Sequence, residues 1–195
     1  MAVKIGNLDV SFKLGSADTK VYLGDTLLYP TAPPSFQGKW LATYTGGTTT
    51  SADCDSTSAI TKSEVRAGNY TAYTKVIIGD CVNNIREAFQ RCSSMTEVEI
   101  GSGVTTDLYY SFEDCSALTS VTWYATSIAN QDGGFQRCSS LQKLVMYATT
   151  PPDISSTMFN GVPSTIIVYV PDEAITDYQN ANIWSNYTIK GHSEL

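Results

Sequence analysis

The chain has 195 residues, enough for one ordinary domain with a small appendage. Only 16% of them are charged, against about 25% in an average soluble protein, and Ser and Thr fill the difference, which predicts a chain rich in β-structure. The net charge of −7 and the lack of any run of Lys or Arg argue against nucleic acid as a ligand. The single histidine, His192, is expected to be a tail residue, so His-dependent catalysis and multi-His metal ligation lose their usual base or ligand. We therefore predict no enzyme, no cofactor and no metal site.

Residues 1–30 predict a small N-terminal β module, because apolar residues alternate from Ile5 to Leu14 and again after a Gly-Ser-Ala-Asp break. No apolar stretch has the length of a signal peptide or of a membrane span, which predicts a protein that is not exported. The stretch Lys20–Pro30 resembles a short element at the front of tail and other structural proteins of bacteriophages, particularly phages of gut bacteria. This resemblance implies that the module attaches to a virion or assembles with copies of itself.

Residues 31–38 contain Pro33 and Pro34 and predict a stiff, extended linker. Residues 39–71 begin with the strand-like run Trp40–Tyr44 and continue with a Gly-Gly turn and a polar stretch. The repeats that begin at residue 72 need a cover on their first apolar face, and we expect residues 39–71 to form that cap.

A repeat of 23 residues occupies residues 72–171. The pattern Phe-x-x-Cys-Ser recurs three times at this period, and a strand position recurs five times at spacings of 22, 23, 23 and 24, from Val76 to Val168. Such a period is typical of a leucine-rich solenoid, in which each turn adds one short strand and one return segment. The predicted fold class is mainly β: a leucine-rich repeat β-solenoid with capping segments, preceded by the small β module.

The Phe-x-x-Cys-Ser-x-Leu-Thr-x-Val pattern resembles the BspA-like, Treponema-type leucine-rich repeats. The carboxyl end is similar to the closing turn and capping helix of that family, so residues 172–195 are expected to form a helical cap and a tail, with Asp172 as the N-cap. Members are typically surface-exposed adhesive or host-interaction modules without catalytic residues. The resemblance implies that class of role.

The repeat core is predicted from the positions that recur with the period. It comprises Phe89, Cys92, Phe112, Cys115, Leu118, Val121, Phe135, Cys138, Leu141 and Phe159. Five cysteines form an odd set in a chain expected to stay unexported, so we predict thiols, with three of them as packing material in this core. Whether Cys54 and Cys81 pair is left open.

Outward positions of the strands are the candidate partner surface, because side chains alternate between the two faces of a strand. The outward set comprises Lys75, Ile77, Gly79, Glu97, Glu99, Gly101, Ser120, Thr122, Tyr124, Lys143, Val145 and Tyr147. Tyr124 and Tyr147 are 23 apart and are expected to be neighbours, and together with Thr122 and Glu99 they form the candidate ligand surface. Exposed aromatics beside hydroxyl groups suit a sugar or a protein, although the same residues could simply cover the sheet.

The predicted function is that of a non-enzymatic bacteriophage virion structural protein (fibre, tail or capsid decoration) that adheres to a host surface. Residues 1–30 would contact other virion proteins or further copies of the chain, and residues 39–195 would bind a host surface protein or glycan, without nucleic acid or membrane insertion. The expected location is the virion, assembled in the bacterial cytoplasm. The alternative is a leucine-rich repeat adhesin of a bacterial cell surface, which normally needs a signal peptide.

Overall fold

The computed structural model describes residues 2–5, 8–12, 21–23, 26–28, 38–44, 49–54, 59–127, 129 and 131–195. The chain divides into two compact units, Met1–Pro34 and Ser35–Leu195. Except for Gly38, the linker predicted over residues 31–38 lies outside the described residues.

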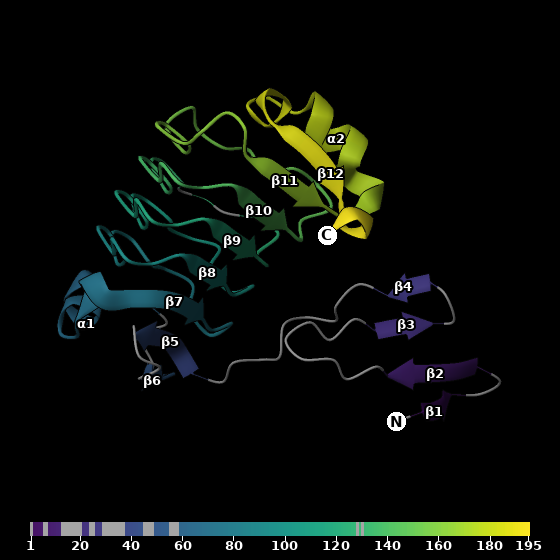
Figure 1. Cartoon of the computed structure of the whole chain (residues 1–195), viewed down its shortest axis with the longest axis horizontal. Coiled ribbons are helices and arrows are strands. Elements are labelled where there is room, and N and C mark those ends of the chain that lie inside the picture. Colours follow the sequence, from purple (N-terminus) through teal and green to yellow (C-terminus); the bar gives the residue numbers. More distant parts are fainter. Residues whose placement is uncertain are drawn as a thin grey trace. The chain divides into compact units, whose positions relative to one another are not determined.

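The first unit is an antiparallel meander, in keeping with the alternation of its apolar residues. Its strands β1 to β4 pair in chain order and span Ala2–Ile5, Leu8–Phe12, Val21–Leu23 and Thr26–Leu28. Each strand is hydrogen-bonded to the next (Figure 1).

The second unit is a stack of parallel strands with connecting turns, a leucine-rich repeat solenoid. Its parallel strands β7 to β12 span Tyr73–Ile78, Glu97–Ile100, Ser120–Trp123, Lys143–Met146, Ile167–Val170 and Thr188–Gly191. Figure 1 shows them following one another as successive rungs, with the turns gathered beside them. The aliphatic position that recurs in the sequence is paired from each strand to the next, so that these residues form one row across the six strands: Val76, Val98, Val121, Leu144, Val168 and Ile189.

A ladder of stacked phenylalanines fills the return side of the repeats. The ring centroids of Phe89 and Phe112 are 5.5 Å apart, those of Phe112 and Phe135 5.3 Å, and those of Phe135 and Phe159 6.0 Å, with interplanar angles of 6 to 8°. All four residues are buried. Because each ring packs on the next turn, no single turn is stable alone, and the stack behaves as one core.

The turns that carry this ladder use the left-handed backbone region at recurring positions. Arg91, Asp114 and Arg137 have φ of 62, 61 and 58°, and they occupy the same place in successive repeats. A second recurring left-handed position is Gly133, where an added Cβ would lie 2.5 Å from the ring of Tyr110. Glycine is required there by the close approach of that ring.

The amino-terminal end of the solenoid is covered by the segment that precedes it. Two antiparallel strands, β5 (Gly38–Tyr44) and β6 (Thr49–Asp53), extend the sheet beyond β7. A short helix, α1 (Lys62–Arg66), and a 3-10 turn over Tyr70–Ala72 follow. Buried Trp40 packs its ring 6.0 Å from that of Phe89, so it closes the phenylalanine ladder.

The helix α1 begins at a capping box. Thr61 Oγ1 accepts a hydrogen bond from the backbone N–H of Glu64 at 3.2 Å, and the Glu64 carboxylate accepts one from the backbone N–H of Thr61 at 2.6 Å. Both bonds satisfy donors that an uncapped helix would leave without partners.

The carboxyl-terminal end corrects two expectations. A short helix, α2 (Ile175–Asn180), is present, but the chain after it returns as β12, a sixth parallel strand, where a tail was expected. The N-cap prediction for Asp172 is also wrong: Pro171 and Ala174 occupy the N-cap positions of the 3-10 turn Asp172–Ala174 and of α2, and Asp172 Oδ1 accepts hydrogen bonds from the backbone N–H and the hydroxyl of Ser193. Asp80 binds Ser102 in the same way, so this aspartate links one turn to the next.

Candidate functional site: the outward sheet face

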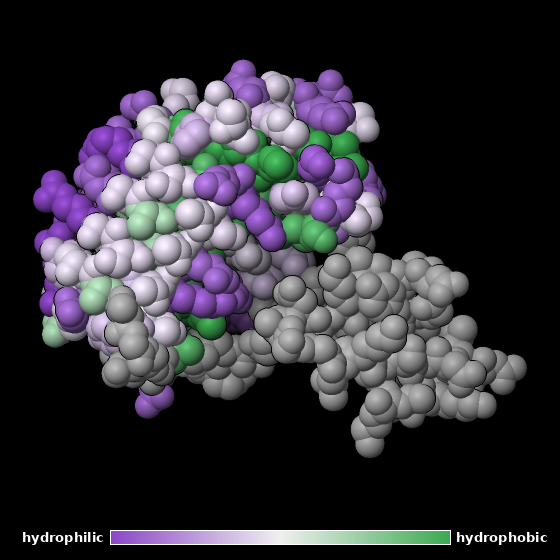
Figure 2. Space-filling view, viewed as in Figure 1, coloured by the Kyte–Doolittle hydropathy of each residue, from purple (hydrophilic) through white to green (hydrophobic). Residues whose placement is uncertain are grey.

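One side of the parallel sheet is lined by the alternate residues that do not enter the core. We call it the outward sheet face, and two of its rows run across β7 to β12: Lys75, Glu97, Ser120, Lys143, Ile167, Thr188, and Ile77, Glu99, Thr122, Val145, Tyr169, Lys190. Most of these residues are partly or fully exposed, but Val145 is only 4% exposed, which corrects its expected outward exposure. In the view of Figure 2, hydrophobic surface gathers toward the end of the repeats that carries β10 and β11.

An aromatic row lies where the strands end. The rings of Tyr124 and Tyr147 are 4.6 Å apart at an angle of 35°, and the ring of His192 lies 4.9 Å beyond Tyr147. Both tyrosines are held by backbone bonds to the preceding turn, Tyr124 N–H to Ile100 O and Tyr147 N–H to Trp123 O. The predicted neighbours Tyr124 and Tyr147 are therefore together, and they are half-buried.

His192 is a structural residue and the expectation of a tail residue is wrong. It is 3% exposed, and because a carbonyl can only accept, its Nε2–H donates to Met146 O at 2.9 Å. Burial lowers the pKa of His192 below its ordinary value, against the opposing hydrogen bond to Met146 and the charges of Asp172 and Glu173. His192 lies one residue past the end of β12, as Tyr124 and Tyr147 lie one residue past the ends of β9 and β10, but the weak sequence signal of β12 hides this equivalence.

The amino-terminal part of the outward sheet face is charged, and one lysine is paired there with two carboxylates. Lys75 Nζ lies 2.7 Å from Glu97 and 2.6 Å from Glu99. Burial opposes the charged form of Lys75, but the hydrogen bonds and charges of the two carboxylates outweigh it and raise the pKa of Lys75. Glu99 is thus held in an ion pair, and the predicted site residue next to it, Thr122, is its register partner on β9.

The carboxyl-terminal part adds residues that the sequence interpretation did not include. Tyr169 continues the row of Thr122 onto β11, and Lys143 Nζ lies 5.8 Å from the centroid of its ring. Lys190 continues the same row onto β12. Tyr169 follows Val168 as Thr122 follows Val121, so the repeat spacing could have identified it, whereas Lys190 depends on β12, whose sequence signal is weak.

The three repeat cysteines carry no site chemistry. Cys92, Cys115 and Cys138 are free and buried, and the thiols of the last two donate to the carbonyls of Phe89 and Phe112 at 3.2 and 3.1 Å. Burial raises the pKa of Cys138 to about 12 and that of Cys115 well above its ordinary value. A thiol that stays protonated is a poor nucleophile and a poor metal ligand. Across the described parts of the chain, no three His, Cys, Asp or Glu residues form a group that could hold a metal ion.

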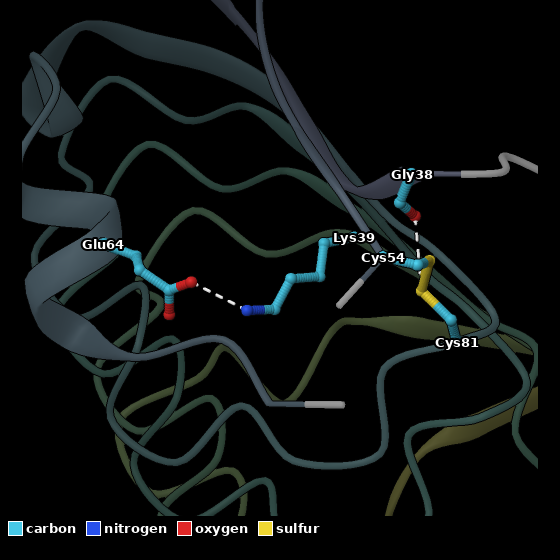
Figure 3. The surroundings of a disulfide bond; sticks show 5 residues. All are labelled: Gly38, Lys39, Cys54, Glu64 and Cys81. Carbon is cyan, nitrogen blue, oxygen red and sulfur yellow. Dashed lines mark hydrogen bonds and ion pairs between the residues drawn. A yellow bond between two sulfur atoms is a disulfide. The ribbon is translucent and has the colours of Figure 1, made fainter. Parts of the chain in front are cut away.

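Cys54 and Cys81, whose pairing the sequence left open, form a disulfide, and the other three cysteines are free thiols as expected. The bond joins the end of β6 to the turn after β7, across 27 residues, and it lies beside Gly38 (Figure 3). Both cysteines are exposed. Figure 3 also shows Lys39 pointing to the carboxylate of Glu64, with 2.7 Å between Nζ and Oε1.

Another recurring set of charges lies on the turns, away from the outward sheet face. Arg137 bonds to Asp114 at 2.6 Å and to Glu113 at 2.7 Å, and Arg91 lies 3.7 Å from Asp114 on the other side. The hydrogen bond from Arg137, which outweighs burial, lowers the pKa of Asp114. These ion pairs link neighbouring turns of the solenoid.

Comparison with known protein families identifies the repeats. The model of the BspA type leucine rich repeat region matches residues 66–189 in six copies. The match extends six residues before and eighteen residues beyond the predicted limits of 72–171, because it takes in the end of the cap and β12. It does not reach Lys20–Pro30, so the resemblance of that stretch to bacteriophage proteins has no support.

No curated protein matches the chain. No described helix has the length and apolar character of a membrane span.

Proposed function

Because the chain belongs to the BspA-type leucine-rich repeat family, we propose that its second unit is an adhesion module of a cell surface. Repeats of this type are typical of surface adhesion and binding proteins and are generally non-catalytic. The proposal is that the outward sheet face binds a protein or a glycan on another surface. It places the cell-surface role ahead of the virion role, which nothing beyond the short stretch Lys20–Pro30 favours.

The observation that carries this proposal is the composition of the outward sheet face and the row at its edge. Tyr124 and Tyr147 lie ring against ring at one edge, and Thr122 and Tyr169 lie in the adjoining row. Aromatic rings combine apolar area with a polar tip, and such residues dominate the energy of many interfaces. The stacked core behind them fixes their backbone, so little conformational entropy is lost when a partner binds.

The disulfide supports a location outside the cytoplasm. Disulfides persist in oxidising compartments, whereas cytosolic thiol buffers reduce exposed ones. Cys54 and Cys81 are both exposed, and the three free thiols are all shielded in the core. This distribution is what a protein exposed to an oxidising medium needs, and it favours the surface adhesin over a particle assembled in the cytoplasm.

The test is a cell-adhesion assay with the fluorescently labelled full-length chain, run in parallel on epithelial and on bacterial cells. The variant Tyr124→Ala with Tyr147→Ala should weaken binding at least about tenfold, since each anchor contributes more than about 1 kcal/mol. The matched control is Tyr109→Ala, which removes a half-buried tyrosine of another ring pair, in the turn before β9. Equal binding by the double variant and the wild type, with both folded by circular dichroism, would contradict the proposal. Treating the cells with glycosidase or with protease distinguishes a glycan from a protein partner.

A further inference from the structure

One lysine of the outward sheet face has no carboxylate partner. Lys143 is exposed on β10, and its Nζ lies over the ring of Tyr169 on β11, 5.8 Å from the centroid. Among the basic side chains that the structure describes in the second unit, Lys143 and Arg66 form no ion pair, and every other one does. Lys143 therefore presents a positive charge that no described carboxylate neutralises, in a chain that has 19 acidic residues and 12 basic ones.

The acidic residues in the two rows of this face are bound to another lysine. Glu97 and Glu99 on β8 both pair with Lys75, and β9 separates β8 from β10. At about 4.8 Å per strand, β8 and β10 are about 10 Å apart. Salt largely screens exposed charges at such a distance. These two carboxylates therefore oppose the approach of an anion to Lys143 only weakly.

Lys143 belongs to a continuous group of side chains around Val145. Thr122 and Tyr169 are the register partners of Val145 on β9 and β11, and Lys143 and Tyr147 are its neighbours on the same face of β10. Val145 is only 4% exposed, so the side chains around it cover it and leave no gap between them. We call these five residues the Lys143 patch. It combines one free cation, two aromatic rings and a hydroxyl group on a rigid sheet.

A second lysine borders the Lys143 patch. Lys190 is the register partner of Tyr169 on β12, so Tyr169 lies between Lys143 on one side and Lys190 on the other. Lys190 Nζ lies 3.0 Å from Glu194, in an ion pair whose side chains are 37% and 48% exposed. Exposed pairs of this kind contribute little free energy, so Lys190 can exchange Glu194 for an incoming anion at small cost.

We infer that the Lys143 patch binds an acidic sugar, a saccharide that carries a carboxylate or a sulfate, with the anionic group at Lys143 and the sugar ring against Tyr147 and Tyr169. The inference rests on the proposed adhesive function and names the chemistry of the partner. A pyranose ring presents C–H groups on its faces, which pack on aromatic rings, and hydroxyl groups at its rim, which bond to polar side chains such as Thr122. The ammonium group of Lys143 has three donors for the anion.

The composition of the outward sheet face favours a sugar over an acidic protein. Its two rows contain no Trp, Phe, Met or Arg, which are enriched at protein interfaces, and they contain three lysines, which are depleted there. Leu195 is the single exposed large hydrophobic residue among those described in the second unit, and it lies outside these rows. The face therefore lacks the large apolar anchors that dominate protein interfaces, and it offers the hydroxyl, aromatic and cationic groups that an acidic sugar can use.

The first experiment is a calorimetric titration of the full-length chain at low ionic strength with four probes: sialyllactose, sulfated lactose, lactose and a hexaglutamate peptide. Sialyllactose carries a carboxylate and sulfated lactose a sulfate, so binding of one or of both supports the inference and identifies the anion. We expect a dissociation constant below about 10 mM for an acidic sugar, and binding of lactose at least about threefold weaker. The inference would be overturned if neither acidic sugar bound, if lactose bound equally well, or if the peptide bound at least as tightly.

The second experiment repeats the titrations with variants at the lysine. Lys143→Gln should weaken binding of the acidic sugar about threefold to fivefold, the loss of one exposed ion pair, and should leave lactose unchanged, whereas Lys143→Arg keeps the charge and should keep the binding. The matched control is Arg66→Gln in α1, which also removes a positive charge beside a tyrosine, since Arg66 Cζ lies 5.3 Å from the centroid of the Tyr70 ring. An equal loss in Arg66→Gln and Lys143→Gln would show that net charge alone matters, and it would refute the site.

The cell-adhesion assay separates this inference from the proposed function. Lys143→Gln should adhere less than the wild type, and treating the cells with sialidase or with sulfatase should lower adhesion of the wild type to the level of the variant. If Tyr124→Ala with Tyr147→Ala loses adhesion while Lys143→Gln and the treated cells behave as before, the acidic sugar is refuted and the adhesive function stands. If both variants adhere like the wild type, both proposals fail.

Discussion

Replacing Phe112 by alanine removes the central ring of the phenylalanine ladder. Phe112 is 0% exposed and stacks on both sides, at 5.5 Å from Phe89 and 5.3 Å from Phe135. Its backbone N–H donates to Gly134 O in the next turn, and this bond survives the substitution. The variant therefore loses packing alone and keeps the hydrogen bonds of the turn.

The magnitude follows from burial and from the two lost ring contacts. Phe→Ala in a core costs about 3 to 5 kcal/mol, and a site fixed from both sides cannot collapse around the cavity, so we expect about 4 kcal/mol. Part of this, about 0.5 to 1.5 kcal/mol per pair, comes from the two stacked contacts. Phe159→Ala is the comparison at the carboxyl-terminal end of the ladder, where Trp184 packs edge-on at 5.8 Å and one stacked contact is lost.

The assay is thermal and urea unfolding of the full-length variants, followed by circular dichroism. For a unit of this size about 4 kcal/mol lowers Tm by roughly 8 to 16 °C. The double variant Phe89→Ala with Phe112→Ala should be less destabilised than the sum of the single variants by at least about 0.5 kcal/mol, since the two residues share one contact. A fall of less than about 2 °C for Phe112→Ala, or strict additivity of the pair, would refute the continuous ladder.

Three further outcomes follow, two from the cysteines and one from His192. Without reductant, a thiol reagent should react with none of Cys92, Cys115 and Cys138 in the native protein and with all three in denaturant, and rapid labelling of the native protein would contradict their burial. Cys81→Ser should lower the free energy of unfolding by about 3 to 4 kcal/mol, because the disulfide closes a loop of 27 residues. Burial lowers the pKa of His192 in the folded protein, so the unfolded chain binds the proton at a higher pH than the folded chain does. The free energy of unfolding should therefore be highest above about pH 6.5 and should fall as the pH drops from there to the folded pKa. Urea titrations of His192→Gln should not show this fall. The same pH dependence in both proteins would show that His192 is not its source.

The repeat architecture could be predicted because its signal is periodic. Phe112 and Cys115 recur 23 residues before and after, and stacking of equal turns is the simplest way to bury such a set. The neighbouring rings of Tyr124 and Tyr147 follow from the same spacing, because equivalent outward positions of adjacent parallel strands face the same side.

The carboxyl-terminal strand β12 escaped prediction because its signal is weak. Its sequence is Thr-Ile-Lys-Gly, with Ile189 as its one aliphatic residue, and it comes only 21 residues after Val168. Once β12 is recognised as a rung, His192 moves from the tail to a buried position next to Tyr147. The strand is identified by its register with β11, a long-range feature that local composition does not contain.

The disulfide could not be predicted from the sequence for a similar reason. Cys54 and Cys81 are 27 residues apart, and only the antiparallel order of β6, β5 and β7 brings their α-carbons to 6.3 Å. Sequence spacing alone does not determine such a geometry.

Because the strands share one register, a whole repeat can be gained or lost without shifting the pairing of the other strands. Removing residues 98–120 would bring Val121 beside Val76, the place that Val98 now occupies, and would take one phenylalanine and one cysteine out of their columns. Both ends of the stack would keep their covers. Gain or loss of one repeat would therefore lengthen or shorten the outward sheet face in steps of about 4.8 Å, one strand at a time. The length of the outward sheet face can therefore change during evolution while the fold stays the same.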